Sequence, residues 1–209
     1  ISMKKILLFA TFILLFVNCF AQQKAVRRAS SYSIEIKKFQ KKYVATHDVV
    51  SAKNKKYFKF YPPSSKYNVL ATFTKIIDTT IIAIKTSGKK IPEKYFIRYG
   101  KLTFTIDSTE YQLTLFQSKD LLNNTEYKDY LFLPFSDKTN GHATYGTGRY
   151  IDLLTTAIEE GKCTLDFNKA YNPYCAYSND YNCPIPPKEN RLAVAISAGE
   201  MNFAKSITH

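Results

Sequence analysis

Residues 101–115, KLTFTIDSTEYQLTL, contain two runs in which apolar and polar residues alternate. Every second residue is apolar in Lys101–Asp107, and the same pattern returns in Tyr111–Leu115. Alternation with a period of two is typical of a β-strand that buries one face. Residues 107–109 lie between the runs and favour a tight reversal of the chain. The stretch therefore predicts an antiparallel hairpin.

Other short segments with strand-like composition surround this hairpin. Gly88, Gly100 and the pair Pro62-Pro63 separate them, as expected for residues that end or bend strands. The further predicted strands are residues 57–61, 67–77, 80–86, 94–99, 129–135 and 192–197. Because little helix lies between them, we expect a mainly β (α+β) fold in which an antiparallel meander forms a sandwich or a partly open barrel.

A different periodicity precedes the strands. Tyr32, Ile36, Phe39 and Tyr43 are spaced by four, three and four residues, which places them on one stripe of a helix. The other faces of this helix carry Lys37, Lys38, Lys41 and Lys42. We expect a basic amphipathic helix region over residues 22–50, followed by a single β-rich domain over residues 51–209.

The first residues resemble an export signal. Met3-Lys4-Lys5 is basic, residues 6–20 are almost entirely apolar, and small residues follow at the position that a signal peptidase reads. We expect residues 1–21 to be an export signal peptide with two leading residues, and the protein to be periplasmic or secreted. The apolar run is short for a membrane span. An alternative is a lipoprotein anchored at Cys19.

Positive charge is concentrated early in the chain. Residues 22–66 contain 12 Lys and Arg against 2 Asp and Glu, a net charge of +10. Such a segment could bind an anionic membrane or glycan surface, or it could be a solvated helix face, which is the more frequent role of a charge run. A nucleic acid partner is disfavoured by the export signal and by the lack of any nucleic acid binding motif.

Residues 163–200 predict a turn-rich C-terminal segment. They include four prolines, four tyrosines and many Asp and Asn residues, which shape the main chain through fixed φ angles and local hydrogen bonds. Cys175 and Cys183 enclose a reversal at Asn179-Asp180 and favour a disulfide in an exported protein. A zinc site is the alternative, although the spacing and the distant histidines argue against a metal. Cys163 is expected to be a buried core residue.

The candidate ligand-binding residues lie around a glycine pair. Gly146 and Gly148 precede Arg149, whose guanidinium can bind a carboxylate or phosphate with two parallel hydrogen bonds. The alternative is a tight turn in which Arg149 pairs with Asp152 or Asp166. The expected aromatic lining consists of Tyr145, Tyr150, Tyr171 and Tyr177. No dinucleotide or phosphate-loop motif is present, and the sequence predicts no cofactor.

Two carboxylates offer a catalytic alternative. Asp166 and Glu189 could act as the acid and base of a hydrolase if they face each other. Asn168, Asn172 and Asn190 are further candidate ligand-binding residues beside Arg149 and the tyrosines. In the simpler interpretation, all of these residues satisfy main-chain groups of the loops.

Several of these segments carry a family resemblance. LPFSDKTNG (133–141), YGTGRYID (145–152), DFNKAYNP (166–173) and CPIPPKEN (183–190) resemble the uncharacterised family called domain of unknown function 1684. The resemblance covers residues 130–200 most closely and implies no activity, substrate or catalytic residue. It also implies relatives without export signals, in which paired cysteines would need a redox or metal role.

Three functional hypotheses follow from the sequence. The first is an exported, non-enzymatic binding module for a small or anionic ligand that uses residues 131–190. The second is a hydrolase that uses Asp166 and Glu189, and the third is a structural protein of the cell envelope.

Overall fold

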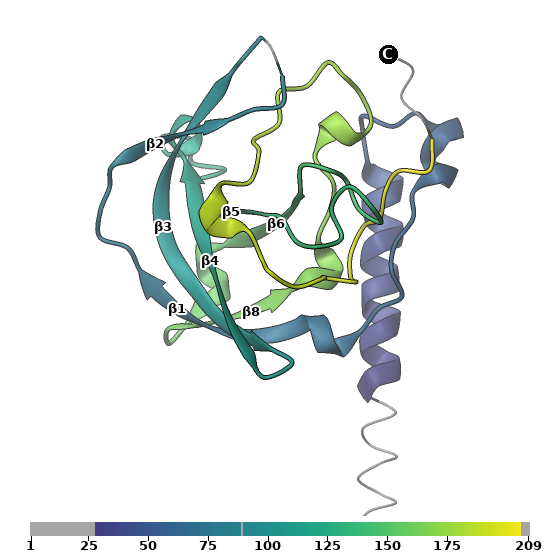
Figure 1. Ribbon diagram of the computed structural model, residues 1–209, viewed down its shortest axis with the longest axis horizontal. Helices are drawn as coiled ribbons and strands as arrows, with labels where there is room; N and C mark the ends of the chain where they lie inside the picture. Colours follow the sequence, from purple (N-terminus) through teal and green to yellow (C-terminus); the bar gives the residue numbers. More distant parts are fainter. Residues whose placement is uncertain (1–27, 89, 206–209) are drawn as a thin grey trace, which may run out of the picture.

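The computed structural model describes residues 28–88 and 90–205, and within them eight strands form one antiparallel sheet (Figure 1). The strands are β1 (Asn68–Lys75), β2 (Ile81–Lys85), β3 (Glu93–Ile106), β4 (Thr109–Ser118), β5 (Tyr130–Phe135), β6 (Arg149–Leu154), β7 (Ile158–Glu159) and β8 (Lys162–Asp166). Their order is β6-β5-β4-β3-β1-β8-β7, with β2 paired to β3. The sheet curls without closing into a barrel, so the expected mainly β, antiparallel fold is confirmed.

The described residues also contain one longer helix and several short 3-10 helices. The longer one, the N-terminal helix, occupies residues 28–46. The 3-10 helices are η1 (Ala52–Tyr57), η2 (Ser65–Tyr67), η3 (Lys119–Leu121), η4 (Thr155–Ala157), η5 (Phe167–Lys169), η6 (Tyr174–Ala176) and η7 (Lys188–Asn190). No helix among the described residues has the length and apolar composition needed to span a membrane.

The predicted hairpin is the centre of the sheet. Strands β3 and β4 pair along their length, from Phe96 opposite Ser118 to Ile106 opposite Thr109. The predicted strands 94–99 and 101–107 are one long strand, which is interrupted only by a shift in register between Arg98 and Gly100. A side chain at residue 100 would collide with the ring of Phe73 on β1, so glycine is required there.

Two residues form the turn of this hairpin, and both have left-handed main-chain conformations. The φ angles are 49° for Asp107 and 63° for Ser108. Positive φ at both central positions defines the turn type whose twist matches that of the flanking strands. Asp tolerates this conformation better than Ser does, because its carboxylate can bond locally.

The core lies inside the curl of the sheet and includes the end of the chain. Leu102, Leu115 and Leu133 from three adjacent strands belong to the same buried cluster as Ile196 and Ala198. The C-terminal segment, which contains Ile196 and Ala198, runs along the concave side of the sheet in Figure 1. Apolar residues from the C-terminal segment therefore fill the space that a second sheet would fill in a sandwich.

Two predicted strands are wrong. Residues 192–197 form no strand; they lie beside residues 136–138, with hydrogen bonds from Leu192 N to Ser136 O and from Lys138 N to Val194 O. Residues 57–61 contribute only the isolated bridge between Phe60 and Glu200. Both segments have strand-like composition, but each forms main-chain hydrogen bonds with only a few residues of a neighbouring segment. Strands β6, β7 and β8 were not among the predicted segments.

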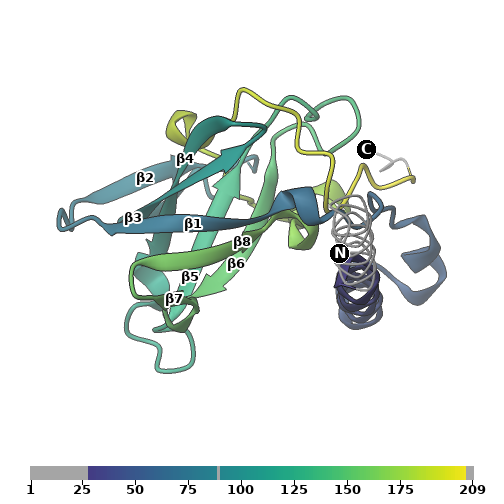
Figure 2. The same cartoon turned by 90° about the horizontal axis from the view of Figure 1, so that it is seen from below.

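The N-terminal helix packs along one side of the body, where Figure 2 shows it nearly end-on. Ile36 and Gln40 are buried against the body, as is His47 just after the helix, and Tyr32 and Tyr43 are half-buried beside them. The predicted amphipathic stripe is therefore present with one correction. Phe39 lies at its edge and is 37% exposed, with the Lys169 ammonium group 5.7 Å from the centre of its ring.

The cysteines follow the prediction. Cys175 and Cys183 form a disulfide, with their Cα atoms 6.2 Å apart. Cys163 on β8 is a buried free thiol in the main core cluster. The expected export signal over residues 1–21 and Cys19 lie outside the described residues.

The β3–β4 turn generates a first prediction. Ser108→Gly should raise the free energy of unfolding by up to about 1 kcal/mol, because glycine adopts positive φ without the steric cost that other residues incur. Ser108→Val should lower it, since a β-branched side chain tolerates this region poorly. Urea denaturation measures both variants. Equal effects of the two substitutions would show that the turn conformation does not limit stability.

Candidate functional site

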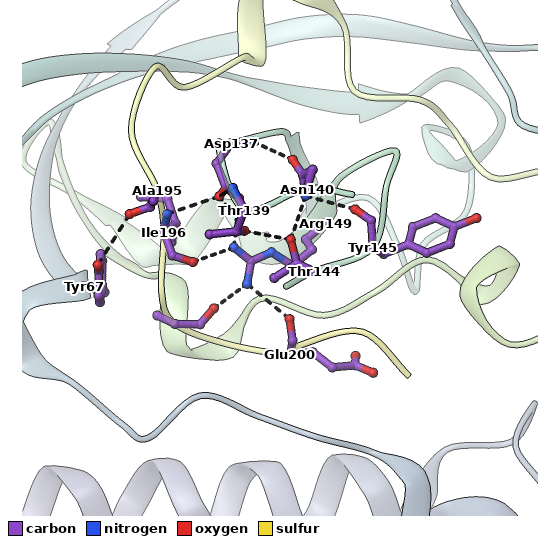
Figure 3. A network of polar contacts seen from close by, with 11 residues as sticks. Tyr67, Asp137, Thr139, Asn140, Thr144, Tyr145, Arg149, Ala195, Ile196 and Glu200 are labelled. Atoms are coloured by element: carbon purple, nitrogen blue, oxygen red, sulfur yellow. Dashed lines mark hydrogen bonds and ion pairs between the residues drawn. The ribbon is translucent and has the colours of Figure 1, made fainter. Parts of the chain in front are cut away.

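Arg149, the expected anion clamp, is the largest fully buried side chain and lies at the start of β6. Its Nη2 donates to Asp137 Oδ2 at 2.9 Å and to the carbonyl oxygen of Ile196 at 2.8 Å. Its Nη1 donates to the carbonyl oxygens of Ala198 and Glu200 (Figure 3). Only Nε lacks a hydrogen-bond partner within the described residues. Arg149 thus holds the C-terminal segment in place, and its NH2 groups are not free for a ligand.

Asp137, and neither Asp152 nor Asp166, is the ion-pair partner of Arg149. Its side chain is fully buried, and its Oδ1 also accepts hydrogen bonds from Thr139 N at 2.8 Å and from Ile196 N at 3.2 Å. A buried ion pair is tolerated when the remaining donors and acceptors are satisfied, as they largely are here. The sequence-based pairing was wrong because residues 137 and 149 meet only through the β5–β6 pairing, which places Phe135 opposite Arg149.

The glycine before Arg149 permits close packing of the protein on itself. Gly148 has a φ of 127°, and a side chain there would lie 2.5 Å from the carbonyl oxygen of Phe135 and 2.6 Å from Pro186. The glycine pair was expected to border a ligand site. At Gly148, the groups that approach the main chain closely belong to strand β5 and the C-terminal segment.

The amide side chains of the predicted site bond to the main chain. Asn168 accepts from Ser64 N and donates to Ser64 O, both at 2.9 Å. Asn190 bonds both main-chain groups of Thr114 and the carbonyl oxygen of Pro134. These two residues join segments that are distant in sequence, which is the simpler of the two roles considered for them.

The two predicted catalytic carboxylates have separate environments. Asp166 accepts hydrogen bonds from Tyr32 Oη at 2.8 Å and from Asn168 N at 3.0 Å. Glu189 forms an ion pair with Arg98 and accepts from the Thr114 hydroxyl at 2.9 Å. Asp166 and Glu189 share no hydrogen-bond partner among the described residues, and each is bound by its own partners.

The predicted tyrosines divide into two groups. Tyr145 and Tyr150 donate their hydroxyl hydrogens to the carbonyl oxygens of Cys175 and Pro184, and so hold the disulfide loop. Tyr171 and Tyr177 instead donate to carboxylates. These carboxylates, Asp152 and Glu200, form two acidic sites that the predicted site did not include.

The first acidic site lies on β6 at an open pocket of about 280 Å³. Tyr130 and Tyr171 each donate a hydrogen bond of 2.6 Å to Asp152 Oδ1. The pocket is lined by Tyr130, Asp152, Leu153, Leu154, Thr156 and Ala157. Asp152 keeps an exposed edge, but the surrounding protein atoms partly desolvate it and raise its pKa, while the two phenol hydrogen bonds oppose this shift.

The second acidic site is completely buried. Glu200 accepts hydrogen bonds from Asn172 N at 2.9 Å and from Tyr177 Oη at 2.7 and 2.8 Å, and Tyr43 Oη of the N-terminal helix lies 3.4 Å from Oε2. Its carboxylate forms no ion pair in the part of the chain that the structure describes. Burial therefore dominates over these hydrogen bonds and raises the pKa of Glu200 to about 7.

Aromatic rings connect the two acidic sites. The ring of Tyr43 lies 5.9 Å from that of Tyr171, whose hydroxyl is bound to Asp152. His47 packs edge-on against Tyr177 at 4.7 Å, and its Nε2 is buried without a hydrogen-bond partner within the described residues. Burial lowers the pKa of His47, which favours the neutral imidazole. The N-terminal helix therefore closes one side of the Glu200 site with aromatic groups.

Strand geometry could have revealed the Asp152 site. Tyr150 and Asp152 are two residues apart on one strand and so share a face of the sheet. Phe132 is paired with Asp152, which makes Tyr130 the diagonal neighbour on the same face, within reach of a long side chain. No comparable sequence signal marks Glu200, because its partners come from loops and from the N-terminal helix.

No set of three or more His, Cys, Asp or Glu side chains that could hold a metal ion is present among the described residues. The structure defines a mainly β, single-sheet protein in which tyrosine hydroxyls donate hydrogen bonds to the carboxylates of Asp152, Asp166 and Glu200. The sequence matches the family model described as "Protein of unknown function (DUF1684)" over residues 53–201, and the chain belongs to this family.

Comparison with solved structures gives a relative of the same fold. The solution NMR structure of an uncharacterised protein from Haloarcula marismortui is 26% identical, with a TM-score of 0.58. The match covers 88% of this chain and 95% of the other. No curated protein matches the sequence.

The raised pKa of Glu200 generates a second prediction. Between pH 4.5 and about 7 the folded protein keeps a proton that the unfolded chain releases, so the free energy of unfolding should fall as the pH rises through this window. The loss should total about 3 kcal/mol and level off above pH 7.

Denaturation of the wild type and Glu200→Gln across this pH range provides the measurement. The variant should lack this part of the pH dependence, whereas Glu110→Gln, which changes an exposed carboxyl on β4, should retain it. Parallel pH profiles for the wild type and Glu200→Gln would contradict the raised pKa.

Proposed function

We propose that this protein is an exported binding module for a small ligand that donates hydrogen bonds, such as a polyol, a sugar or an amine. The proposed site is the pocket beside Asp152. Export rests on the sequence of residues 3–21 alone.

The observation that carries the proposal is the hydrogen bonding of the Asp152 carboxylate. Two tyrosines saturate Oδ1, while Oδ2 has no hydrogen-bond partner within the described residues. The carboxylate is thus held in a fixed orientation at the pocket with one oxygen available. A charged acceptor that is already oriented binds a hydroxyl or ammonium group with little further loss of conformational freedom.

Pocket size and lining restrict the ligand further. A volume of about 280 Å³ is at the lower end of small-molecule sites, which suits a ligand with about one ring. Apolar side chains and the Tyr130 ring supply most of the wall, and Asp152 and Thr156 supply its polar groups. Aromatic and carboxylate groups together suit sugars and amines, which present both C–H faces and polar hydrogens.

The sequence suggested an anionic ligand, but the charges of the residues around the pocket do not favour one. An anion in this pocket would face the Asp152 carboxylate, and like charges repel. Arg149 is fully buried and its NH2 groups are occupied by Asp137 and by main-chain carbonyl oxygens. We therefore assign the ligand to the neutral or cationic class.

Titration followed by NMR tests this function. Glucose, inositol and ethanolamine serve as donors of hydrogen bonds, with acetate and inorganic phosphate as anionic counterparts. At least one donor should perturb the signals of residues 152–157, and Asp152→Asn should weaken its binding about tenfold or more, because a hydrogen bond to a charged acceptor is lost.

Glu189→Gln is the matched control, since Glu189 does not line the pocket and is one of the two carboxylates predicted for a hydrolase. It should bind as the wild type does. Binding of the anions alone, or equal loss of binding in both variants, would refute the assignment of the site to Asp152.

A further inference from the structure

The packing of the N-terminal helix determines which of its residues face solvent. Ile36 and Gln40 are buried against the body, so the direction opposite them points away from the protein. Successive residues of an α-helix are rotated by about 100°. On this geometry the line opposite the buried stripe runs through residues 34, 38, 41 and 45.

This outward line is basic and is flanked by further lysines. Lys38 and Lys41 lie on it, Lys37 and Lys42 lie on its two sides, and all four are exposed. None of them forms an ion pair within the described residues. Lysine side chains spread on both sides of a helix are arranged to contact a flat negatively charged surface.

The next segment extends the same positive surface. The Lys55 ammonium group donates a hydrogen bond to the carbonyl oxygen of Ala45, so η1 lies beside the end of the N-terminal helix. Figures 1 and 2 place both elements on the same side of the molecule, away from the β2–β3 arm. Residues 28–59 contain nine Lys and Arg against Glu35 and Asp48, a net charge of +7.

One large apolar side chain accompanies the lysines. Ile34 lies on the outward line and is 54% exposed. An exposed isoleucine on a lysine-rich helix suits the boundary between lipid headgroups and acyl chains, whereas a soluble polyanion offers it no apolar environment.

The sequence upstream is consistent with a membrane nearby. The apolar run of residues 6–20 is separated from the described start of the helix only by residues 21–27. If that run were retained, or if Cys19 carried a lipid, the N-terminal helix would be held close to the bilayer.

We propose that the outward face of the N-terminal helix, together with η1, binds the surface of an anionic phospholipid bilayer. Lys37, Lys38, Lys41 and Lys42 contact the headgroups, and Ile34 enters the interfacial layer. This surface is separate from the Asp152 pocket and does not depend on the function proposed for it.

Vesicle sedimentation of the full chain tests this proposal. The protein should bind vesicles of equimolar phosphatidylcholine and phosphatidylglycerol more tightly than phosphatidylcholine vesicles, and added salt should remove the difference. The fourfold Lys→Gln variant at residues 37, 38, 41 and 42 should lose about 100-fold or more in partitioning, because each basic residue near such a surface contributes roughly a factor of five.

The matched control replaces Lys85, Lys101, Lys119 and Lys162 with Gln, which removes the same charge from exposed sites on other elements. It should bind within about threefold of the wild type. A second variant, Ile34→Ser, keeps the charge and should also bind the anionic vesicles more weakly.

Three results would overturn the proposal. Equal losses in the two fourfold variants would show that net charge alone drives binding. Equal binding to both kinds of vesicle by the wild type would remove the electrostatic role of the lysines. Tight binding to heparin without binding to the anionic vesicles would assign the surface to a polyanionic glycan.

Discussion

The buried ion pair between Arg149 and Asp137 is the interaction on which the rest of the structure depends. A guanidinium with no exposed surface is stable only if its charge is neutralised and its donors are satisfied. Asp137 provides the charge, and the carbonyl oxygens of residues 196, 198 and 200 accept the remaining hydrogen bonds. The C-terminal segment must therefore run along the concave side of the curled sheet, where it supplies the core residues that close the fold.

This path of the chain positions the two acidic sites. It brings Glu200 to Asn172 and Tyr177. The N-terminal helix adds Tyr43, and His47 follows directly after the helix. Tyr171 then reaches across β6 to Asp152, beside the open pocket. The buried Glu200 site links the helix to the body through Tyr43, whereas the Asp152 site lies beside the open pocket, where we propose that a ligand binds. Packing of the helix in turn directs its lysines outward.

Local patterns predicted the parts of the structure that depend on near neighbours. The alternation in residues 101–115 gave the central hairpin, and the spacing of Tyr32, Ile36 and Tyr43 gave the helix stripe. The ion pair of Arg149 was missed because Asp137 reaches it through strand pairing, and residues 192–197 were misassigned because strand-like composition does not reveal whether a partner strand exists. Asp166 and Glu189 have carboxylate chemistry, but only the tertiary structure shows that each has its own partners.

Hydrogen exchange of Asp137→Asn tests the central role of the ion pair most directly. The substitution keeps the shape of the side chain but leaves the buried guanidinium uncompensated, so the protein should lose about 3–5 kcal/mol of stability. The amide of Ile196, which donates to Asp137, should then exchange at least about 100-fold faster, and the C-terminal segment should lose protection before the β3–β4 hairpin does. Unchanged protection of Ile196 in the variant would show that the C-terminal segment is held by other contacts.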